Sequence, residues 1–440
     1  MDRKGLAAIE ILKKLREKGF QAYWVGGCVR DLVMGVAPKD YDISTDATPE
    51  QVAGLFPESL SVGARFGVMI VPREEGNVEV ATFRSDGRYN DGRHPVEVRY
   101  TKSPREDVQR RDFTINGLLY DPLNEQVLDY VGGQADIGAR HVRTIGDPYA
   151  RFSEDRLRML RAVRFSARLK FALDGAAKEA IRKHAPDIRQ VSAERLRDEI
   201  LKILTEGQAR SGFQLLDETG LLQEILPEVK RMQGVAQPPQ FHPEGDVWVH
   251  TMMMLDGLRS PTPTLALGVL LHDVGKPPTF SIRERIRFDR HVEVGAKMAE
   301  EIASRLRLSS RDTERVVELV RRHLGFKDFP RMRRSTQLRF LRMEGFEEHL
   351  ELHRLDCLAS HGDLTCYEMI KGMLAETAAE EIRPAPLLRG DDLIAQGYTP
   401  GPIFKEILQA VEDAQLEGTI HTSVDALRLV ADRFPLSARS

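Results

Sequence analysis

The segment from residue 22 to residue 46 constrains the fold of this chain most strongly. An apolar run, Ala22–Val25, predicts a buried strand that ends at the turn formed by Gly26 and Gly27. A short helical segment, 29–34, follows, and residues 39–43 then predict a second strand. This order of strand, glycine turn, short helix and strand predicts an α/β fold at the start of the chain.

Two spacings within this segment indicate chemistry. Side chains alternate between the faces of a strand, so Asp40 and Asp42 point the same way, with Cα atoms roughly 7 Å apart. Two carboxylates on one face can hold a pair of hard divalent cations, as in-line phosphoryl or nucleotidyl transfer requires. The turn at Gly26 and Gly27 brings backbone N–H groups to an anion, and Arg30 adds positive charge for a triphosphate.

Together, Gly-Gly-x-x-Arg-Asp at 26–31 and Asp-x-Asp at 40–42 resemble the catalytic signature of the nucleotidyltransferase superfamily. The resemblance is to the class II group that contains tRNA CCA-adding enzymes and bacterial poly(A) polymerases, and it covers nearly the whole chain. It implies an α/β nucleotidyltransferase head, with a mixed β-sheet and helices, followed by a mostly α-helical neck, an HD-containing body and a tail. The implied domains are the catalytic head at 1–145, the helical neck at 146–205, a helical body and linker at 206–243, the HD-type metal-binding domain at 244–375 and a tRNA-binding tail at 376–440.

A third carboxylate is implied at Glu79, which lies in the alternating segment 78–84. By the resemblance it joins Asp40 and Asp42, whereas by spacing alone a solvent-facing strand residue fits equally well. A turn-rich loop at 85–105 is similar to a flexible loop that accompanies addition of the terminal A, which argues against an enzyme that adds only C.

The segment Arg-Arg-Asp-Phe-Thr-Ile-Asn-Gly at 110–117 resembles the second signature of the same class. The resemblance implies that Arg111 binds phosphates and that Asp112 binds the ribose 2′-OH. Without the resemblance, the same residues fit a charged stretch that simply precedes a buried apolar segment.

The neck contains an arginine-rich helix for which Ser153 is the predicted N-cap. Asp155 lies one turn before Arg158, so a carboxylate acceptor and a guanidinium donor can reach one base edge and read C or A without a nucleic-acid template. A solvated arginine face is the alternative. The template motif of the family implies that Asp155 and Arg158 select the base and that Arg161 and Arg164 assist nucleotide binding.

Histidine and aspartate residues recur in helical context between residues 242 and 356. An adjacent His-Asp pair at a helix end, with further His and Asp residues, can converge on one or two divalent cations. The segment His-Asp-Val-Gly-Lys-Pro at 272–277 resembles the HD phosphohydrolase domain. It implies a core set of metal ligands, His250, His272, Asp273 and Asp356, with His291 and His323 for a second metal.

Bulk properties exclude few functions. No apolar run approaches the roughly 20 residues that span a bilayer. Three cysteines, an odd number without metal-like spacing, favour a reducing cytoplasm. The net charge of −3 does not identify a nucleic-acid-binding protein, although arginine is dense in residues 140–170.

The resemblance implies a template-independent RNA nucleotidyltransferase that adds nucleotides from CTP and ATP to the 3′ end of tRNA. Mg²⁺ is the expected cofactor of the head, and a second divalent metal is expected in the HD domain. Full CCA addition, a specialist that adds the terminal A and a poly(A) polymerase are alternatives that the residues leave open. Functions of other classes are an HD-domain metal-dependent phosphohydrolase and a tRNA-binding chaperone.

Overall fold

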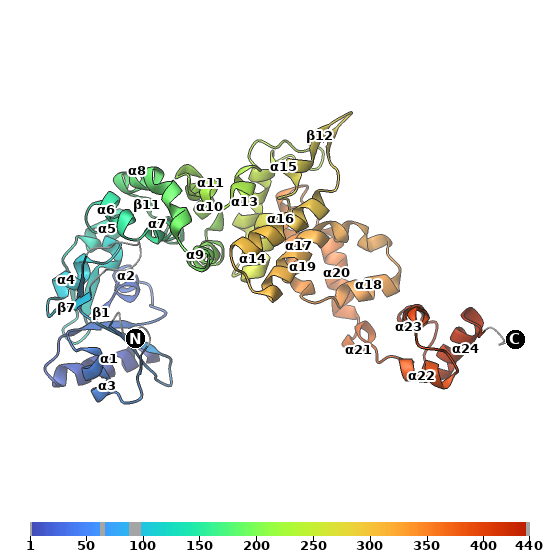
Figure 1. Cartoon of the computed structure of the whole chain (residues 1–440), viewed down its shortest axis with the longest axis horizontal. Helices are drawn as coiled ribbons and strands as arrows, with labels where there is room; N and C mark the ends of the chain where they lie inside the picture. The colour runs from blue at the N-terminus through green and yellow to red at the C-terminus, as the bar shows by residue number, and fades with distance from the viewer. Residues whose placement is uncertain (1, 62–66, 88–97, 437–440) are drawn as a thin grey trace. The chain divides into compact units, whose positions relative to one another are not determined.

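The computed structural model describes residues 2–61, 67–87 and 98–436, and it divides into two compact units (Figure 1). Unit 1 comprises Met1–Arg231, Leu258–Pro263 and Ile302–Leu308, and unit 2 comprises Met232–Gly257, Thr264–Glu301 and Ser309–Ser440. None of the described helices has the length and apolar composition that crossing a membrane requires. The central part of the loop predicted at 85–105 lies outside the described residues.

Unit 1 begins with a seven-stranded mixed sheet in the order β3-β4-β5-β2-β1-β8-β9. Strands β2 and β5 are parallel, and the other neighbouring pairs are antiparallel. Their bounds are β1 Ala22–Val25, β2 Asp42–Thr45, β3 Leu60–Ser61, β4 Val68–Val71, β5 Val78–Thr82, β8 Leu118–Asp121 and β9 Gln126–Asp129. This sheet with its helices, followed by a largely helical chain, confirms the predicted fold class.

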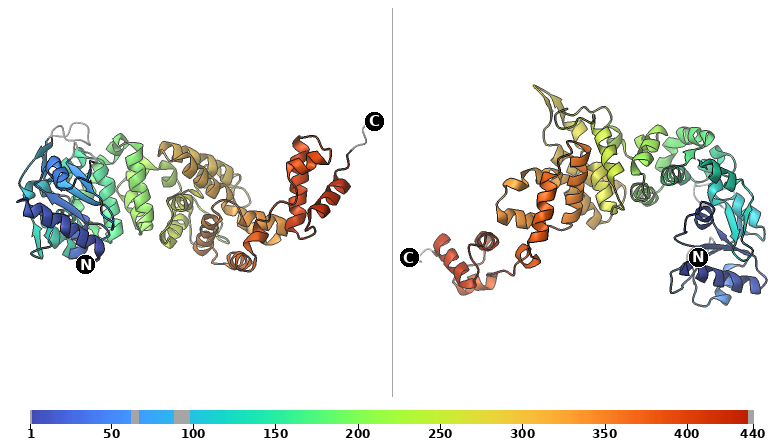
Figure 2. Two further views of the ribbon diagram at one scale, coloured as in Figure 1. Left: turned by 90° about the horizontal axis from the view of Figure 1, so that it is seen from below. Right: turned by 180° about the vertical axis from the view of Figure 1, so that it is seen from behind.

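Helices flank the sheet, and α1 packs against β1 and β2 (Figure 2). Asp2 caps α1 by accepting a hydrogen bond from Gly5 N, and the helix buries Ile11, Leu12 and Leu15 at helical spacing. The elements of this region are α1 Arg3–Glu17, α2 Gly27–Val33, α3 Pro49–Leu55, β6 Arg84–Asp86, β7 Val98–Tyr100, α4 Pro104–Gln109, η2 Thr114–Asn116 and α5 Gly133–Ala139.

The prediction that Ser153 caps the arginine-rich helix is wrong. Asp147 accepts a hydrogen bond from Ala150 N and caps an earlier helix, α6 (Pro148–Glu154), which has proline at its first position. Asp155 then takes an extended conformation, with φ −143° and ψ 106°, and α7 (Leu157–Leu169) starts two residues later. The local Asp-Pro signal therefore fixes the helix start, and Asp155 lies at a break.

The rest of unit 1 is helical apart from a short parallel pair, β10 and β11. The arginine-rich α7 packs against α9 and α10. The bounds are β10 His141–Val142, β11 Ala172–Leu173, α8 Gly175–His184, η3 Ala185–Gln190, α9 Ala193–Thr205, α10 Ala209–Glu218, α11 Leu221–Ile225 and α12 Pro227–Lys230.

Unit 2 is a set of helices with one β-hairpin. The apolar helix α14 (Pro263–Leu271) buries every residue from Leu265 to Leu271, as expected for a helix at the centre of a core. The other elements are α13 Val247–Gly257, α15 Lys276–Thr279, β12 Phe280–Ile282, β13 Ile286–Phe288, α16 His291–Arg305, α17 Ser310–Arg322, η4 His323–Arg331, α18 Arg334–Leu341, α19 Phe346–Ala359, α20 Thr365–Glu376, α21 Ala379–Ile382, α22 Gly390–Ala395, α23 Pro402–Leu416 and α24 Ser423–Arg433.

Candidate functional site

Three carboxylates gather at the start of β2. Asp42 and Glu79 each precede one member of the parallel register pair Ile43–Val80, so they lie beside each other on β2 and β5. Burial, and then the negative charges of Glu79 and Asp40, raise the pKa of Asp42 to about 6. Such mutual repulsion is relieved by a bound cation, and oxygen ligands suit Mg²⁺. The residues present therefore fit a divalent cation.

The prediction that Asp40 and Asp42 share one face of a strand is wrong, because β2 begins at Asp42. Asp40 lies in the loop before β2, with its side chain 74% exposed. Lys4 of α1 reaches this loop, with Nζ 2.9 Å from Asp40 Oδ1 and 2.9 Å from the Lys39 carbonyl oxygen. Sequence analysis did not identify Lys4, because a contact between residues 36 positions apart leaves no local pattern. The first helix therefore supports the loop that carries one of the candidate catalytic acids.

The glycine turn is flanked by two guanidinium groups. Gly26 has φ 76° and ψ −129°, a backbone conformation that only glycine adopts readily. A Cβ at Gly26 would lie 3.7 Å from Arg111 Nη1, and one at Gly27 would lie 3.6 Å from Arg30 Nη2. The tight turn and the two arginines together form a positively charged corner beside Asp42.

The two arginines of this corner differ in exposure. Arg111 is 19% exposed and pairs with the buried Asp107 at 3.0 Å; although burial opposes it, Arg111 and Arg110 lower the pKa of Asp107 to about 2. Arg30 is buried, and its Nη1 donates to Asn116 Oδ1 at 2.8 Å. Arg30 thus joins the first motif to the second, which sequence analysis did not predict.

Asp112 joins the sheet region to α7. Arg161 donates to Asp112 Oδ2 from Nε at 2.7 Å, and its Nη2 lies 2.6 Å from the same oxygen. Although burial opposes it, Arg161 lowers the pKa of Asp112, so this carboxylate stays ionised. Two residues of the expected nucleotide site therefore contact each other.

The expected base-reading pair is held by separate partners. Asp155, at the break between α6 and α7, lies 2.9 Å from Arg195 Nη2 of α9. Arg158 Nη1 lies 2.6 Å from Glu154 Oε2. Both side chains lie in unit 1, and each already has a partner of opposite charge.

Phe165 of α7 gathers three of the expected nucleotide-binding arginines. The guanidinium carbons of Arg30, Arg161 and Arg164 lie 5.7, 5.3 and 4.4 Å from the centre of its ring, within cation–π range. Arg164 also pairs with the buried Glu199 at 2.7 Å. Sequence analysis missed Phe165, although an aromatic residue among the arginines of α7 was a usable signal.

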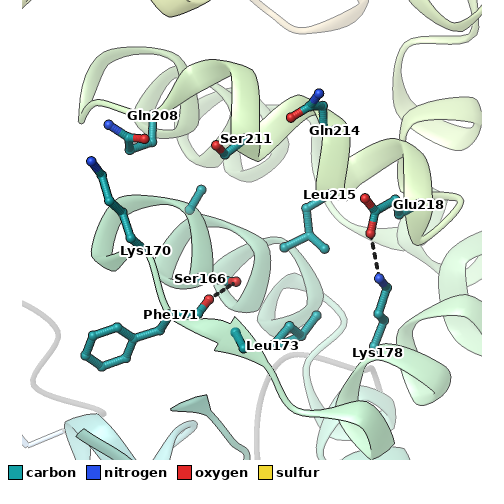
Figure 3. Close-up of a pocket in the computed structure, with 12 residues that line it drawn as sticks. Ser166, Lys170, Phe171, Leu173, Lys178, Gln208, Ser211, Gln214, Leu215 and Glu218 are labelled. Carbon is teal, nitrogen blue, oxygen red and sulfur yellow. Dashed lines mark hydrogen bonds and ion pairs between the residues drawn. The ribbon is translucent and has the colours of Figure 1, made fainter. Parts of the chain in front are cut away.

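A cavity of about 570 Å³ lies elsewhere in unit 1, between α7, β11 and α10 (Figure 3). Lys170, Gln208 and Ser211 line it, and Lys178 pairs with Glu218 at its side, at 2.5 Å. None of the expected site residues lines this cavity.

In unit 2 the structure brings together all six expected HD ligands. His272 and Asp273 follow α14 and form one close group with His250 of α13. Asp273 forms a second close group with His291 and His323. His250 Nε2 lies 3.1 Å from Asp356 Oδ1 of α19. We call these six residues the HD centre.

Three histidines of the HD centre have a fixed tautomer. Their Nδ1 atoms lie 2.8, 2.9 and 2.7 Å from backbone carbonyl oxygens, for His272, His291 and His323 respectively. Nδ1 must then donate, which leaves the Nε2 lone pair facing the centre. Burial lowers the pKa of His291 and lowers that of His323 to about 4, so both rings are neutral.

Several inward-facing atoms of the HD centre form no hydrogen bond within the described ranges, although His272 Nε2 lies 3.1 Å from Asp273 Oδ2. Among the described residues, the buried Asp273 Oδ1, His272 Nε2 and His291 Nε2 form no hydrogen bond. Asp273 Oδ1 lies 3.9 Å from His291 Nε2 and 3.8 Å from His323 Nε2, too far for hydrogen bonds but suited to two ligands of one cation. The donor set of nitrogen and oxygen fits a divalent transition metal.

Sequence patterns did not predict three residues that lie near the HD centre, namely His242, Glu244 and Lys276. Glu244 Oε1 lies 2.9 Å from His242 Nδ1 and 2.7 Å from His250 Nδ1. The buried Lys276 lies 2.6 Å from Asp273 Oδ2. Lys276 belongs to the motif at 272–277, so it could have been predicted as a site residue from the sequence. No sequence motif marked Glu244 as a site residue.

Three family models match the chain. Residues 22–143 match the Poly A polymerase head domain, residues 170–233 match a probable RNA and SrmB-binding site of polymerase A, and residues 246–354 match the HD domain.

Curated relatives are CCA-adding enzymes. That of Bacillus pumilus is 42% identical over 218 residues, which are 50% of this chain and 54% of the relative. That of Bacillus subtilis is 44% identical over 241 residues, which are 55% of this chain and 60% of the relative. The chain thus spans somewhat more than half the length of the curated relatives it matches.

Solved structures resemble the chain over its whole length. The CCA-adding enzyme of Bacillus stearothermophilus in complex with CTP has a TM-score of 0.75 and 27% identity, and covers 98% of this chain and 99% of that one. The Thermotoga maritima CCA-adding enzyme complexed with tRNA has a TM-score of 0.58 and 20% identity, and covers 98% of this chain and 96% of its own. The second likeness shows the fold alone.

Proposed function

Because the chain belongs to the family of tRNA CCA-adding enzymes and bacterial poly(A) polymerases, we propose that it adds nucleotides from CTP and ATP to the 3′ end of tRNA without a template. The observation that carries this proposal is the group of carboxylates around Asp42 beside the glycine turn and Arg111. The solved CCA-adding enzyme of Bacillus stearothermophilus, to which this chain is 27% identical, is in complex with CTP. We propose the cytoplasm as its compartment, since these substrates meet there.

In this proposal Asp40, Asp42 and Glu79 hold Mg²⁺. When bound, the metal supplies Lewis acidity to the RNA 3′-hydroxyl and charge neutralisation to the leaving pyrophosphate. The triphosphate binds at the corner formed by the glycine turn, where backbone N–H groups and Arg111 face its oxygens. Arg30 supports this corner by donating a hydrogen bond to Asn116.

Asp112 would accept the ribose hydroxyl, because the ion pair with Arg161 keeps its carboxylate ionised and fixed. Arg164 would support α7 through Glu199 while lying against the same aromatic ring as Arg161. These two arginines then act on the nucleotide by positioning Asp112 and α7.

Asp155 and Arg158 would read the base by exchanging their present partners for its Watson–Crick edge. The carboxylate accepts from an exocyclic amine, and the guanidinium donates to a ring nitrogen or carbonyl. The present partners include Glu154 of α6 for Arg158 and Arg195 of α9 for Asp155.

An end-addition assay tests the main function. Purified protein is incubated with tRNA ending at the discriminator base, at C or at CC, with labelled CTP or ATP. CCA addition predicts CTP use on the first two substrates and ATP use on the third. Use of ATP on the third substrate alone identifies the terminal-A specialist, and repeated ATP addition identifies a poly(A) polymerase.

Substitutions of Asp40 and Asp42 test whether these acids carry nucleotide incorporation. Asp42→Asn is expected to abolish incorporation, whereas Glu75→Gln, in the exposed turn before β5, removes a nearby charge and is expected to retain it. Undiminished incorporation by the Asp40→Asn, Asp42→Asn double variant would refute the proposal.

The HD centre supports a second function, metal-dependent hydrolysis of a phosphate ester. The observation that favours it is the set of buried atoms on Asp273, His272 and His291 that form no hydrogen bond among the described residues. A generic phosphodiester assayed with Mn²⁺, Co²⁺ or Ni²⁺ tests it. Asp273→Asn should abolish hydrolysis and leave nucleotide addition intact, and Asp42→Asn should do the reverse.

A further inference from the structure

A two-stranded hairpin extends away from the helices of unit 2, where Figure 1 labels it β12. Its strands are antiparallel, with Phe280 opposite Phe288 and Ile282 opposite Ile286. Arg283 N donates to the Arg285 carbonyl oxygen, which continues the pairing to the tip. The hairpin is therefore paired along its full length.

The register gives the hairpin two different faces. Side chains alternate along each strand, and directly opposed residues share a face. One face is apolar and carries Phe280, Ile282, Ile286 and Phe288. The other face carries Ser281 and Arg287, and Arg283 and Arg285 lie in the exposed turn at the tip, on either side of Glu284.

The tip of the hairpin and part of its apolar face are exposed. Ile282 is 68% exposed and Phe280 is 38% exposed. Within the described part of the chain, Arg283, Arg285 and Arg287 form no ion pair, and Arg287 Nε is shielded from water without a hydrogen-bond partner. Many arginines elsewhere are paired, as in the contact between Arg161 and Asp112.

The base of the hairpin contacts the HD centre. The Phe288 ring lies 6.3 Å from the His291 ring, and Lys276 Nζ lies 5.4 Å from the centre of the Phe288 ring. Lys276 in turn pairs with Asp273. A ligand that runs along the hairpin is thus led to the candidate metal ligands.

We propose that the β12–β13 hairpin binds single-stranded RNA and directs its phosphates toward the HD centre. Guanidinium groups bind successive phosphates, and exposed aromatic and apolar side chains support unpaired bases, a combination typical of single-strand binding. The acidic residues Glu284 and Asp289 are outnumbered by the four arginines between residues 283 and 290. An acidic peptide would also pair with the arginines, but it carries no phosphate that the HD centre, at the base of the hairpin, could act on. RNA binding by the hairpin does not depend on the proposed hydrolase function, whereas the delivery of phosphates to the HD centre rests on it.

Cross-linking of the full chain to a short single-stranded RNA that carries 4-thiouridine tests the binding. Mass spectrometry of the cross-linked peptides separates the hairpin from RNA contacts elsewhere. The wild-type chain should cross-link within residues 280–291. The triple variant Arg283→Gln, Arg285→Gln, Arg287→Gln should lose this cross-link, and Ile282→Ser should weaken it.

The matched control is Arg311→Gln, Arg331→Gln, Arg333→Gln, which removes the same charge from exposed arginines of the same unit. Its cross-link should persist. In fluorescence anisotropy, loss of three phosphate contacts should flatten the slope of log affinity against log salt by about 2. A cross-link that survives the hairpin triple variant overturns the proposal, as does equal competition by poly-glutamate.

Failure of the hydrolase function gives a different result. Asp273→Asn should abolish hydrolysis and leave the hairpin cross-link unchanged. If the wild-type chain hydrolyses no phosphodiester but its hairpin still cross-links, the binding stands and only the delivery is refuted.

Discussion

Lys4 Nζ lies 2.9 Å from Asp40 Oδ1, so the first helix of the chain holds one of the candidate catalytic acids. This ammonium group competes for the carboxylate with any cation that Asp40 ligates. It also donates to the Lys39 carbonyl oxygen and thereby orders the loop before β2. The contact gives α1 a role at the site besides packing on the sheet.

We expect Lys4→Gln to strengthen divalent-cation binding in the head. Removing an exposed competing charge should lower the apparent dissociation constant for Mn²⁺ by a factor of about two to five, the range of surface ion pairs. Calorimetric titration measures it, in an Asp273→Asn background that removes the HD centre. Lys13→Gln, an exposed lysine of the same helix, is the control. Weaker Mn²⁺ binding by Lys4→Gln would show that ordering the loop outweighs competition.

The raised pKa of Asp42 predicts a pH-dependent stability without metal. Its pKa rises from 3.8 to about 6, mainly through burial, so the folded state binds more protons than the unfolded state between these values. Stability therefore falls as pH rises from about 4 to about 6, and the ionised group destabilises the fold at pH 7. Asp42→Asn should stabilise the head at pH 7 in EDTA by as much as about 3 kcal/mol.

Denaturation followed by Trp24 fluorescence, in a Trp248→Phe background, measures this difference, because Trp24 lies in the core of the head sheet. The stabilisation should vanish at pH 4, where Asp42 is protonated in the folded protein. A stabilisation that persists unchanged at pH 4 would contradict the assignment to ionisation.

The ion pair of Asp112 with Arg161 should show strong coupling. Asp112 is nearly buried and Arg161 donates to it through two nitrogens, so removal of one partner leaves a poorly solvated charge. We expect Arg161→Ala to destabilise the chain by roughly 2 kcal/mol, and Asp112→Asn, Arg161→Ala to cost less than the sum of the single changes. A double-mutant cycle of unfolding free energies measures the coupling, and additive effects would refute it.

Divalent metal should stabilise unit 2. A ligand that binds the folded state alone, at a hundred times its dissociation constant, adds about 2.7 kcal/mol. We expect Mn²⁺ or Ni²⁺ to raise the melting temperature of the Asp42→Asn chain, in which the head site is weakened, and EDTA to reverse the rise. Asp273→Asn should remove the effect, whereas His421→Gln, an exposed histidine of the tail, should keep it. A rise that survives Asp273→Asn would place the metal elsewhere.

Patterns confined to short segments could be read from the sequence. The strand and glycine turn before α2 and the His-Asp motif at 272–277 are local, because backbone freedom and side-chain direction depend on neighbouring residues. The local pattern predicted an α/β start of the chain, whereas the mixed sheet of the head followed by helices was implied by the family resemblance. The wrong cap at Ser153 shows the limit, since the Asp147-Pro148 pair was the stronger local signal.

Tertiary structure decided which distant residues meet. The pairing of β2 with β5 places Glu79 beside Asp42, and the packing of α1 brings Lys4 to Asp40. Five segments, namely α13, the end of α14, α16, η4 and α19, bring the six HD ligands together, and Glu244 joins them from a loop. The sequence by itself determined the chemical groups and their local directions. Their convergence, and the ion pairs that already hold Asp112 and Asp155, depend on the burial of distant apolar surfaces, which has no short sequence pattern.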